Sequence, residues 1–151
     1  LWLEYADDYR DLRQDSIGSM HGNYIVDDFE QLNKSGRKIF DLLLDVDKSK
    51  ARSVAKYYLD MQKVTKICKS SLVPGGMVLM VIGNTAYKGV HVDNVKHLVE
   101  SLLDSGFDSV SVTKRKISGK ILTPYRDENG RFSSNSSKRS VYSEEYIVVG
   151  R

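Results

Sequence analysis

The sequence has 151 residues, of which 40% are hydrophobic and 28% charged, enough for one ordinary hydrophobic core and too few for two. Its single cysteine excludes an internal disulfide and fits a reducing compartment, and no apolar stretch reaches the length of a membrane span. The net charge of +3 hides an asymmetry: residues 1–47 carry 11 acidic and 5 basic side chains, whereas residues 113–139 carry 8 basic and 2 acidic ones.

The basic block indicates a polyanionic partner. A net charge of +6 within 27 residues suits a polyphosphate, so nucleic acid is the predicted partner. The alternative is a solvated loop whose lysines and arginines only keep the protein soluble. The first residue is leucine and no signal-like segment is present, which favours a cytoplasmic protein and a fragment of a longer chain.

Residues 1–49 are predicted to form a lead-in of helices and loops. Residues 2–13 have apolar side chains at near-helical spacing, and residues 17–24 form a connecting loop. Residues 29–44 are expected to form two short helices, interrupted by a Ser-Gly pair.

Two longer helices are predicted in the remaining segment, 50–151. Apolar side chains recur at three and four residues through 50–72, which predicts a helix that packs one stripe on a sheet. Cys68 lies on that stripe, so it is interpreted as a packing residue and not as a nucleophile. The second helix spans 93–105, with Asp93 suited to its start and Gly106 to its end.

The string LVPGGMVLMVIGN, residues 72–84, predicts a buried strand that follows a tight turn. Its unbroken apolar run is typical of a strand covered on both faces. Ligands of open α/β sheets sit beyond the carboxyl ends of strands, so Gly83, Asn84 and Thr85 are candidates for functional positions.

Two further strands are predicted at 107–117 and 145–149, separated by a long Ser-, Arg- and Lys-rich excursion at 118–143. An excursion of this length is unusual unless it binds a partner or is disordered. The order of elements describes half of a doubly wound α/β sheet.

This order and several strings resemble the site-specific DNA methyltransferases that use S-adenosylmethionine and modify an exocyclic amino group, of the cytosine-N4 or adenine-N6 type. The match is to the carboxyl-terminal half of that family, over nearly the whole chain. In the family a Leu-x-Pro-Gly-Gly turn leads to the fifth strand, which ends in Gly-Asn, as in residues 72–84. The other strings that carry the resemblance are the Gly-Phe after a helix at 106–107, RKISGKILTPYRDENGRF at 115–132, YSEEYIVVGR at 142–151 and the opening LWLEYADDYRDLRQDSIG.

The resemblance implies part of a class I methyltransferase (Rossmann-like) sheet. Residues 77–83, 107–117 and 145–149 would be its fifth, sixth and seventh strands, with the last strand antiparallel and inserted between the other two. The edge of the fifth strand would then be exposed, and such an edge can pair with another chain or form a homodimer.

The family's catalytic tetrad, Ser, Asp or Asn followed by Pro-Pro-Tyr or Pro-Pro-Trp, does not occur in the sequence, and neither does its Gly-rich cofactor loop. No catalytic or cofactor-binding residue is therefore assigned. The resemblance implies a restriction-modification enzyme whose amino-terminal half, or a second chain, supplies the chemistry, so this chain alone is predicted to be inactive. The alternatives are a noncatalytic α/β module that binds nucleic acid or another partner, and a fragment of an RNA methyltransferase.

The candidate DNA-binding residues form two groups. In the first group, the side chains could contact the target base or its phosphates, or serve only turn chemistry. In the second group, Tyr125 and Arg126 could stack on a base and grip a phosphate, or form a turn anchored on the core, while basic neighbours add backbone affinity. The first group is Asn84, Thr85 and Lys88, and the second is Arg115, Lys116, Lys120, Tyr125, Arg126 and Arg131. The three histidines lack ligand-spaced neighbours, so no metal site is predicted.

Overall fold

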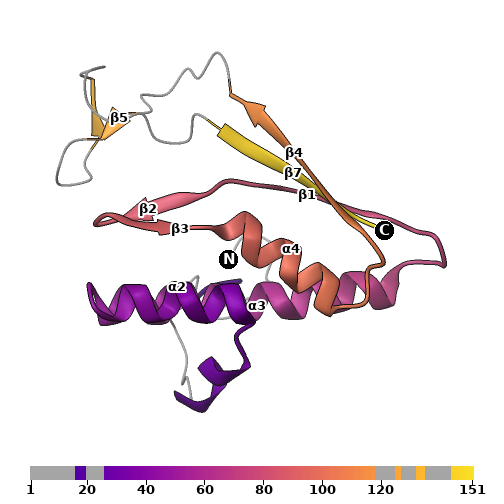
Figure 1. Ribbon diagram of the computed structural model, residues 1–151, viewed down its shortest axis with the longest axis horizontal. Coiled ribbons are helices and arrows are strands. Elements are labelled where there is room, and N and C mark those ends of the chain that lie inside the picture. The colour runs from indigo at the N-terminus through magenta and orange to yellow at the C-terminus, as the bar shows by residue number, and fades with distance from the viewer. Residues whose placement is uncertain (1–15, 20–25, 118–124, 127–131, 135–143) are drawn as a thin grey trace, which may run out of the picture.

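The computed structural model describes residues 16–19, 26–117, 125–126, 132–134 and 144–151. Its main sheet has three strands in the order β1-β7-β4 (Figure 1). β1 (Val78–Ile82) and β4 (Val110–Lys116) both pair antiparallel with β7 (Glu144–Gly150), so they run parallel to each other. The predicted insertion of an antiparallel last strand between the other two is confirmed, and the fold is mixed α/β. The seven-stranded sheet of a methyltransferase stays a prediction.

The connection from β1 to β4 passes through a hairpin and a helix. The hairpin consists of β2 (Thr85–Tyr87) and β3 (Val90–Val92), and α4 (Asn94–Asp104) follows. α4 packs on one face of the sheet and forms a buried cluster there. The cluster comprises Val95, Leu98, Leu102, Phe107 and Val148, bordered by side chains of β1 that include Val78, Met80 and Ile82.

Both ends of α4 agree with the prediction. The side chain of Asp93 accepts a hydrogen bond from the backbone N–H of Lys96, as an N-cap does. Gly106 has a φ of 90° just past the C-cap, in the left-handed region where glycine carries no steric cost.

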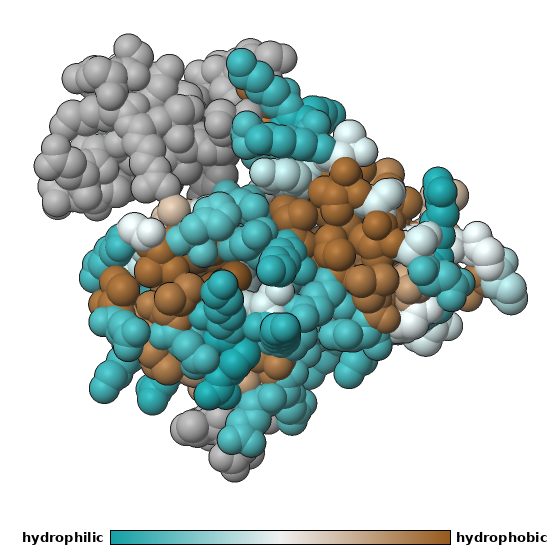
Figure 2. Space-filling view, viewed as in Figure 1, coloured by the Kyte–Doolittle hydropathy of each residue, from teal (hydrophilic) through white to brown (hydrophobic). Residues whose placement is uncertain are grey.

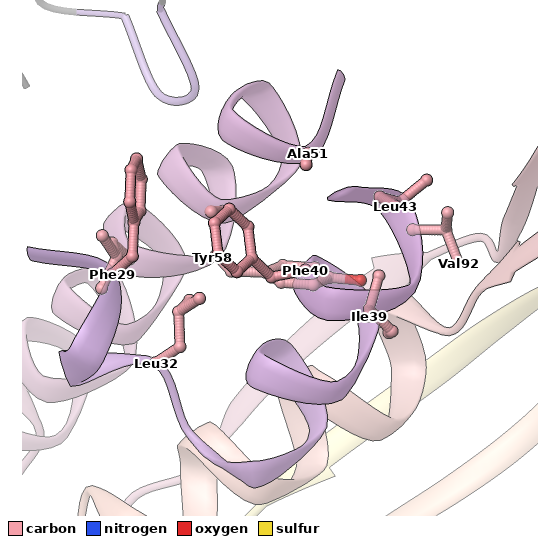
Figure 3. Close-up of a cluster of buried hydrophobic side chains, with 10 residues drawn as sticks. Phe29, Leu32, Ile39, Phe40, Leu43, Ala51, Tyr58 and Val92 are labelled. Atoms are coloured by element: carbon pink, nitrogen blue, oxygen red, sulfur yellow. The ribbon is translucent and has the colours of Figure 1, made fainter. Parts of the chain in front are cut away.

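Three helical elements lie on the side of α4 that faces away from the sheet, two of them packed on α4 and the shortest packed on the longest (Figure 1). They are η1 (Val26–Gln31), α2 (Lys34–Leu44) and α3 (Lys48–Ser71). Their common core, shown in Figure 3, comprises Phe29, Leu32, Ile39, Phe40, Leu43, Ala51, Ala55, Tyr58, Leu59 and Val92. None of the helices in the described part of the chain is long and apolar enough to cross a membrane.

Two expectations about these helices were wrong. The break between the two short helices lies at Leu32 and Asn33 and not at the Ser-Gly pair, because the side chain of Asn33 caps α2 by accepting from the N–H of Gly36 at 2.8 Å. α3 does not pack its stripe on the sheet: α4 lies in between, and Met61 of α3 and Leu72, the residue that follows the helix, border the sheet cluster.

The expectation that β1 is covered on both faces was also wrong for the described residues. Met77, Leu79 and Val81 are 55%, 60% and 54% exposed, whereas the alternate positions face α4. Apolar residues accordingly gather on the surface near the sheet in Figure 2. Among the described strands, β7 alone pairs with β1. The other edge of β1 is therefore open, as predicted.

The hairpin of β2 and β3 was not predicted, although its turn left a signal in the sequence. Lys88 and Gly89 have φ values of 45° and 86°, the pattern of a two-residue turn of type I′, which favours glycine. A Lys-Gly pair between Thr-Ala-Tyr and Val-His-Val is that signal.

Gly89 provides a test of this turn. Replacing Gly89 with alanine should lower the free energy of unfolding by about 1 kcal/mol, because a side chain at positive φ is strained even though the surrounding space is open. Gly83→Ala is the matched control: that Cβ would meet one atom at 3.8 Å and no strained φ. Urea unfolding of both variants measures the difference, and equal stabilities would contradict the assigned turn.

The predicted excursion between β4 and β7 contains two short paired strands. β5 (Tyr125–Arg126) pairs antiparallel with β6 (Phe132–Ser133). They form a separate two-stranded sheet.

Candidate functional site

The carboxyl ends of β1 and β4 lie at the same end of the sheet, on either side of β7. Ile82, Tyr146 and Lys114 lie side by side across the three strands, because β7 pairs with both neighbours in register. Asn84 follows β1 at this end, and Lys116 ends β4 there. The structure therefore brings parts of both predicted groups of site residues to the same end.

Asn84 anchors the end of β1 to the start of α4. Its Oδ1 accepts a hydrogen bond from the N–H of Val95 at 3.0 Å, and its Nδ2 donates to Asp93 Oδ1 at 3.0 Å. Both ends of the amide are thus engaged within the protein. This geometry favours the turn interpretation of Asn84, and its contact with DNA stays a prediction.

Asn94 makes a second bridge, which sequence reasoning missed. Its Nδ2 donates to the carbonyl of Gly83 at 2.9 Å, and its Oδ1 accepts from the hydroxyl of Tyr58 at 3.0 Å. Burial raises the pKa of Tyr58, so the hydroxyl stays protonated and keeps donating. The two asparagines therefore tie the carboxyl end of β1 to the start of α4 and, through Tyr58, to α3.

The hairpin is tied to the start of α3 through Asp47. The hydroxyl of Tyr87 donates to Asp47 Oδ2 at 2.7 Å, while Oδ1 accepts from the N–H of Lys50 and caps α3. The backbone N–H of Lys50, and then the Tyr87 hydroxyl, lower the pKa of Asp47, so the carboxylate stays charged. The same bond raises the pKa of Tyr87, because ionisation would break it.

Lys88 extends from the hairpin turn. Its Nζ lies 3.6 Å from Asp47 Oδ2, and its side chain is 58% exposed. Lys88 and Lys50 also place their ammonium groups 5.4 Å and 5.5 Å from the centre of the Tyr87 ring. The carboxylate of Asp47 therefore partly neutralises Lys88, and the contact of Lys88 with DNA stays a prediction.

A groove of about 370 Å³ lies between the hairpin and α3. Tyrosine rings, hydroxyls, an amide and one ammonium group converge on it from several elements, a combination that suits a planar polar ligand with negative charge. Thr85 is the predicted site residue that lines it. The lining comprises Ile17, Gly18, Lys50, Ser53, Val54, Tyr57, Thr85, Ala86, Tyr87, Val92 and Asn94. A larger hollow of about 680 Å³ lies along α2. Its lining comes from that helix and the residue after it alone, so side chains from different elements do not converge on it.

The end of β4 is less free to bind phosphate than predicted. Arg115 pairs with Glu145 across the strands, and Lys114 Nζ lies 2.7 Å from Glu144. The carboxylate of Glu144 raises the pKa of Lys114. Lys116 is exposed and lies opposite Glu144 in the pairing. The carboxylates of β7 therefore partly neutralise the cations of this strand.

The other predicted residues lie in the excursion. Tyr125 and Arg126 form β5, and Lys120 and Arg131 lie outside the described residues. Within the described ranges, no group of three His, Cys, Asp or Glu side chains is placed to hold a metal ion.

Comparisons of the chain with models of known protein families, with curated proteins and with solved structures gave no match. The residues and their geometry are therefore the basis for assigning a function.

Proposed function

We propose that the chain is the carboxyl-terminal part of a DNA methyltransferase, which transfers a methyl group from S-adenosylmethionine to an exocyclic amino group of a base. The strand order supports this proposal most directly. An antiparallel last strand lies between two parallel strands that a helix connects, as expected for strands five to seven of that family. The Leu-x-Pro-Gly-Gly turn and the Gly-Asn end flank the first of these strands.

The two edges of the sheet support the presence of further strands. β4 is an edge strand of the sheet and carries Lys114, Arg115 and Lys116. Charged side chains on an edge strand discourage pairing with a further strand. β1 has the sequence VLMVI, with no charge and no proline, and leaves one apolar face uncovered among the described residues. An edge of this kind is suited to a partner strand, which the amino-terminal half would supply.

The role proposed for this chain is the substrate-side wall of the site. Its groove and Lys88 of the hairpin turn lie beyond the carboxyl end of β1, where substrates of open α/β folds bind. The Gly-rich loop that would hold S-adenosylmethionine does not occur in the sequence. The residues present do not fit that cofactor, so none is assigned to it and no step of methyl transfer is derived.

The test is methyl transfer by the product of the complete coding sequence. That product should incorporate tritium from labelled S-adenosylmethionine into plasmid DNA, whereas residues 1–151 alone should not. Residues 1–151 added to a separately produced amino-terminal half should restore incorporation. A complete product of 151 residues that gains activity from no companion chain would overturn the proposal.

A noncatalytic nucleic-acid-binding module is the second candidate, and the charge of the chain favours it. Such a module would bind DNA or RNA without any methyl transfer by the complete product. Labelled RNA in the same assay separates an RNA methyltransferase from a DNA methyltransferase.

A further inference from the structure

The outer edge of β2 is unpaired in the described part of the chain, where β3 is its one partner strand. Tyr87 and Val90 flank the two-residue turn, so they exchange two backbone hydrogen bonds. The next pair, Ala86 and His91, exchanges none, because the two kinds of pair alternate along an antiparallel ladder. The N–H and C=O of Ala86 therefore point away from β3, and neither forms a hydrogen bond with another described residue.

This edge of β2 borders the groove between the hairpin and α3. The side chains of Thr85 and Tyr87 lie on the face of the hairpin that looks toward α3, since the Tyr87 hydroxyl binds Asp47 at the start of that helix. Side chains alternate along a strand, so the methyl group of Ala86 lies on the opposite face, yet Ala86 lines the groove. Ala86 therefore contributes its backbone, with a donor and an acceptor side by side.

One side of α3 forms the opposite wall. Its lining residues are half-buried, and at about 100° per residue they lie within an arc of about 100° on the helix. They are Lys50, Ser53, Val54 and Tyr57. The wall thus offers an apolar surface from Val54 and the ring of Tyr57, beside a hydroxyl and an ammonium group.

Lys50 supplies positive charge to the groove. No carboxylate within the described ranges forms an ion pair with Lys50, whereas Lys88 lies 3.6 Å from Asp47. The Nζ of Lys50 lies 5.5 Å from the centre of the Tyr87 ring, which attracts the cation without neutralising it. An ammonium group of this kind suits a phosphate.

The loop at 16–19 completes the lining. The N–H of Gly18 donates to Asp60 Oδ2 of α3 at 2.9 Å, and a Cβ added to Gly18 would lie 3.3 Å from the Cβ of Tyr57. The loop, the helix and the hairpin are therefore tied to one another around the groove. Its volume of about 370 Å³ is within the range of small-molecule sites.

A nucleotide matches this set of groups. A nucleobase is a flat ring with a donor and an acceptor side by side on its edge, as the amino group and the neighbouring ring nitrogen of adenine and cytosine are. Such an edge can accept from the N–H of Ala86 and donate to its C=O, while the ring rests on Val54 and Tyr57 and the phosphate meets Lys50. In a duplex the partner base occupies that edge, so the nucleotide must be unpaired.

We infer that the groove binds one nucleotide of an unpaired nucleic acid strand, with its base on the backbone of Ala86 and its phosphate at Lys50. The inference deepens the proposed function and rests on it for the strand, whereas the match to a nucleotide rests on the groove itself. Because base and phosphate are held by different walls, neither part alone should bind well.

The experiment follows the backbone amide signals of the isotope-labelled chain by NMR during titration with dAMP, dCMP, deoxyribose phosphate and an unpaired octanucleotide of adenine and cytosine. The signals of Ser53, Thr85 and Ala86 should shift with dAMP and dCMP. Deoxyribose phosphate should bind about ten-fold more weakly, since it lacks the base. The octanucleotide should bind about ten-fold more tightly than dAMP, since its neighbouring phosphates add electrostatic attraction.

Two pairs of variants test the two contacts. Ala86→Pro removes the N–H that reaches the base but no ladder hydrogen bond of the hairpin, and it should weaken dAMP binding about five-fold or more. His91→Pro is the matched control, because it removes the corresponding N–H on the other edge of the same hairpin, and it should change the affinity less than about two-fold. Lys50→Gln should weaken binding about ten-fold, and Lys48→Gln, which is exposed on the opposite side of the same turn, less than about two-fold. Circular dichroism confirms that each variant folds.

No shift of the groove signals with either nucleotide, or equal weakening by the members of each pair, would overturn the inference. Octanucleotide binding no tighter than that of dAMP would assign the groove to a free nucleotide and reject the strand. Binding of an acidic pentapeptide along the edge of β2, with no nucleotide bound, would assign the groove to a protein partner and also reject it. Methyl transfer by the complete product without nucleotide binding in this groove would leave the proposed function standing, and nucleotide binding without methyl transfer would do the reverse.

Discussion

Replacing Leu102 with alanine is expected to lower the free energy of unfolding by about 2–5 kcal/mol. Leu102 of α4 is fully buried in the cluster that joins the helix to the sheet, together with Leu98, Phe107 and Val148. Truncation removes the transfer free energy of the buried methyl and methylene groups and leaves a cavity that the surrounding elements fill only in part. Urea denaturation followed by circular dichroism measures the loss.

Leu103 is the matched control, because it is the next residue of the same helix and is 48% exposed. Leu103→Ala should change stability by less than about 0.5 kcal/mol. Its face of α4 points away from the sheet cluster, and alanine is the better helix former. Equal losses for the two variants would mean that α4 does not pack on the sheet as described.

The succession of the main helices and strands along the chain could be predicted because local signals mark where several of them begin and end. The Pro-Gly-Gly turn stops α3 before β1, and Gly76 closes that turn by donating to the carbonyl of Val73 at 2.9 Å. Asp93 and Gly106 mark the two ends of α4. These are interactions within a few residues, which periodicity and capping rules capture. The place of β7 between β1 and β4 is a long-range pairing and came from the family resemblance.

Burial was harder to predict than secondary structure. The run of apolar residues in β1 is the same whether a second layer covers the strand or a partner outside the described residues does so, and Leu79 and Val81 are exposed here. The amphipathic stripe of α3 likewise requires an apolar neighbour without saying which one. Helix α4 takes that place: Tyr58 of α3 stacks on His97 of α4 with 3.8 Å between ring centres, and the hydroxyl of Thr65 donates to the carbonyl of Ser101.

The location of the candidate site was easier to predict than the residues that form it. Residues after β1 lie at the expected edge, since the carboxyl end of a strand is fixed by chain direction. The groove depends on Tyr57, Tyr87 and Asn94, which come from three elements and have no shared sequence pattern. The ion pairs of Lys114 and Arg115 with β7 depend on strand register, which a block of basic residues does not reveal.

His97 gives the second large prediction, a loss of stability in mild acid. The ring is buried to 1% exposure, stacks on Tyr58 at 3.8 Å between ring centres, and has Nε2 3.4 Å from Gln62 Oε1. Burial lowers the pKa of His97 from 6.5 to about 3, because a cation there would lose its hydration. The unfolded chain therefore binds a proton near pH 6.5 that the folded chain refuses, and stability falls as the pH drops below that value.

The slope is about 1.4 kcal/mol per pH unit between the unfolded and folded pKa values, so His97 should contribute a loss of about 2 kcal/mol between pH 7 and pH 5. His97→Phe keeps a flat ring against Tyr58 and removes the titrating group. Between pH 7 and pH 5 the variant should therefore lose about 2 kcal/mol less stability than the parent chain. His91 is exposed, and His91→Phe should keep the parental pH dependence. Urea unfolding at pH 5, 6 and 7 provides the comparison. Parallel pH profiles for the parent and His97→Phe would show that the buried ring takes up a proton in the folded state, and that the packing of α4 on α3 tolerates a charge.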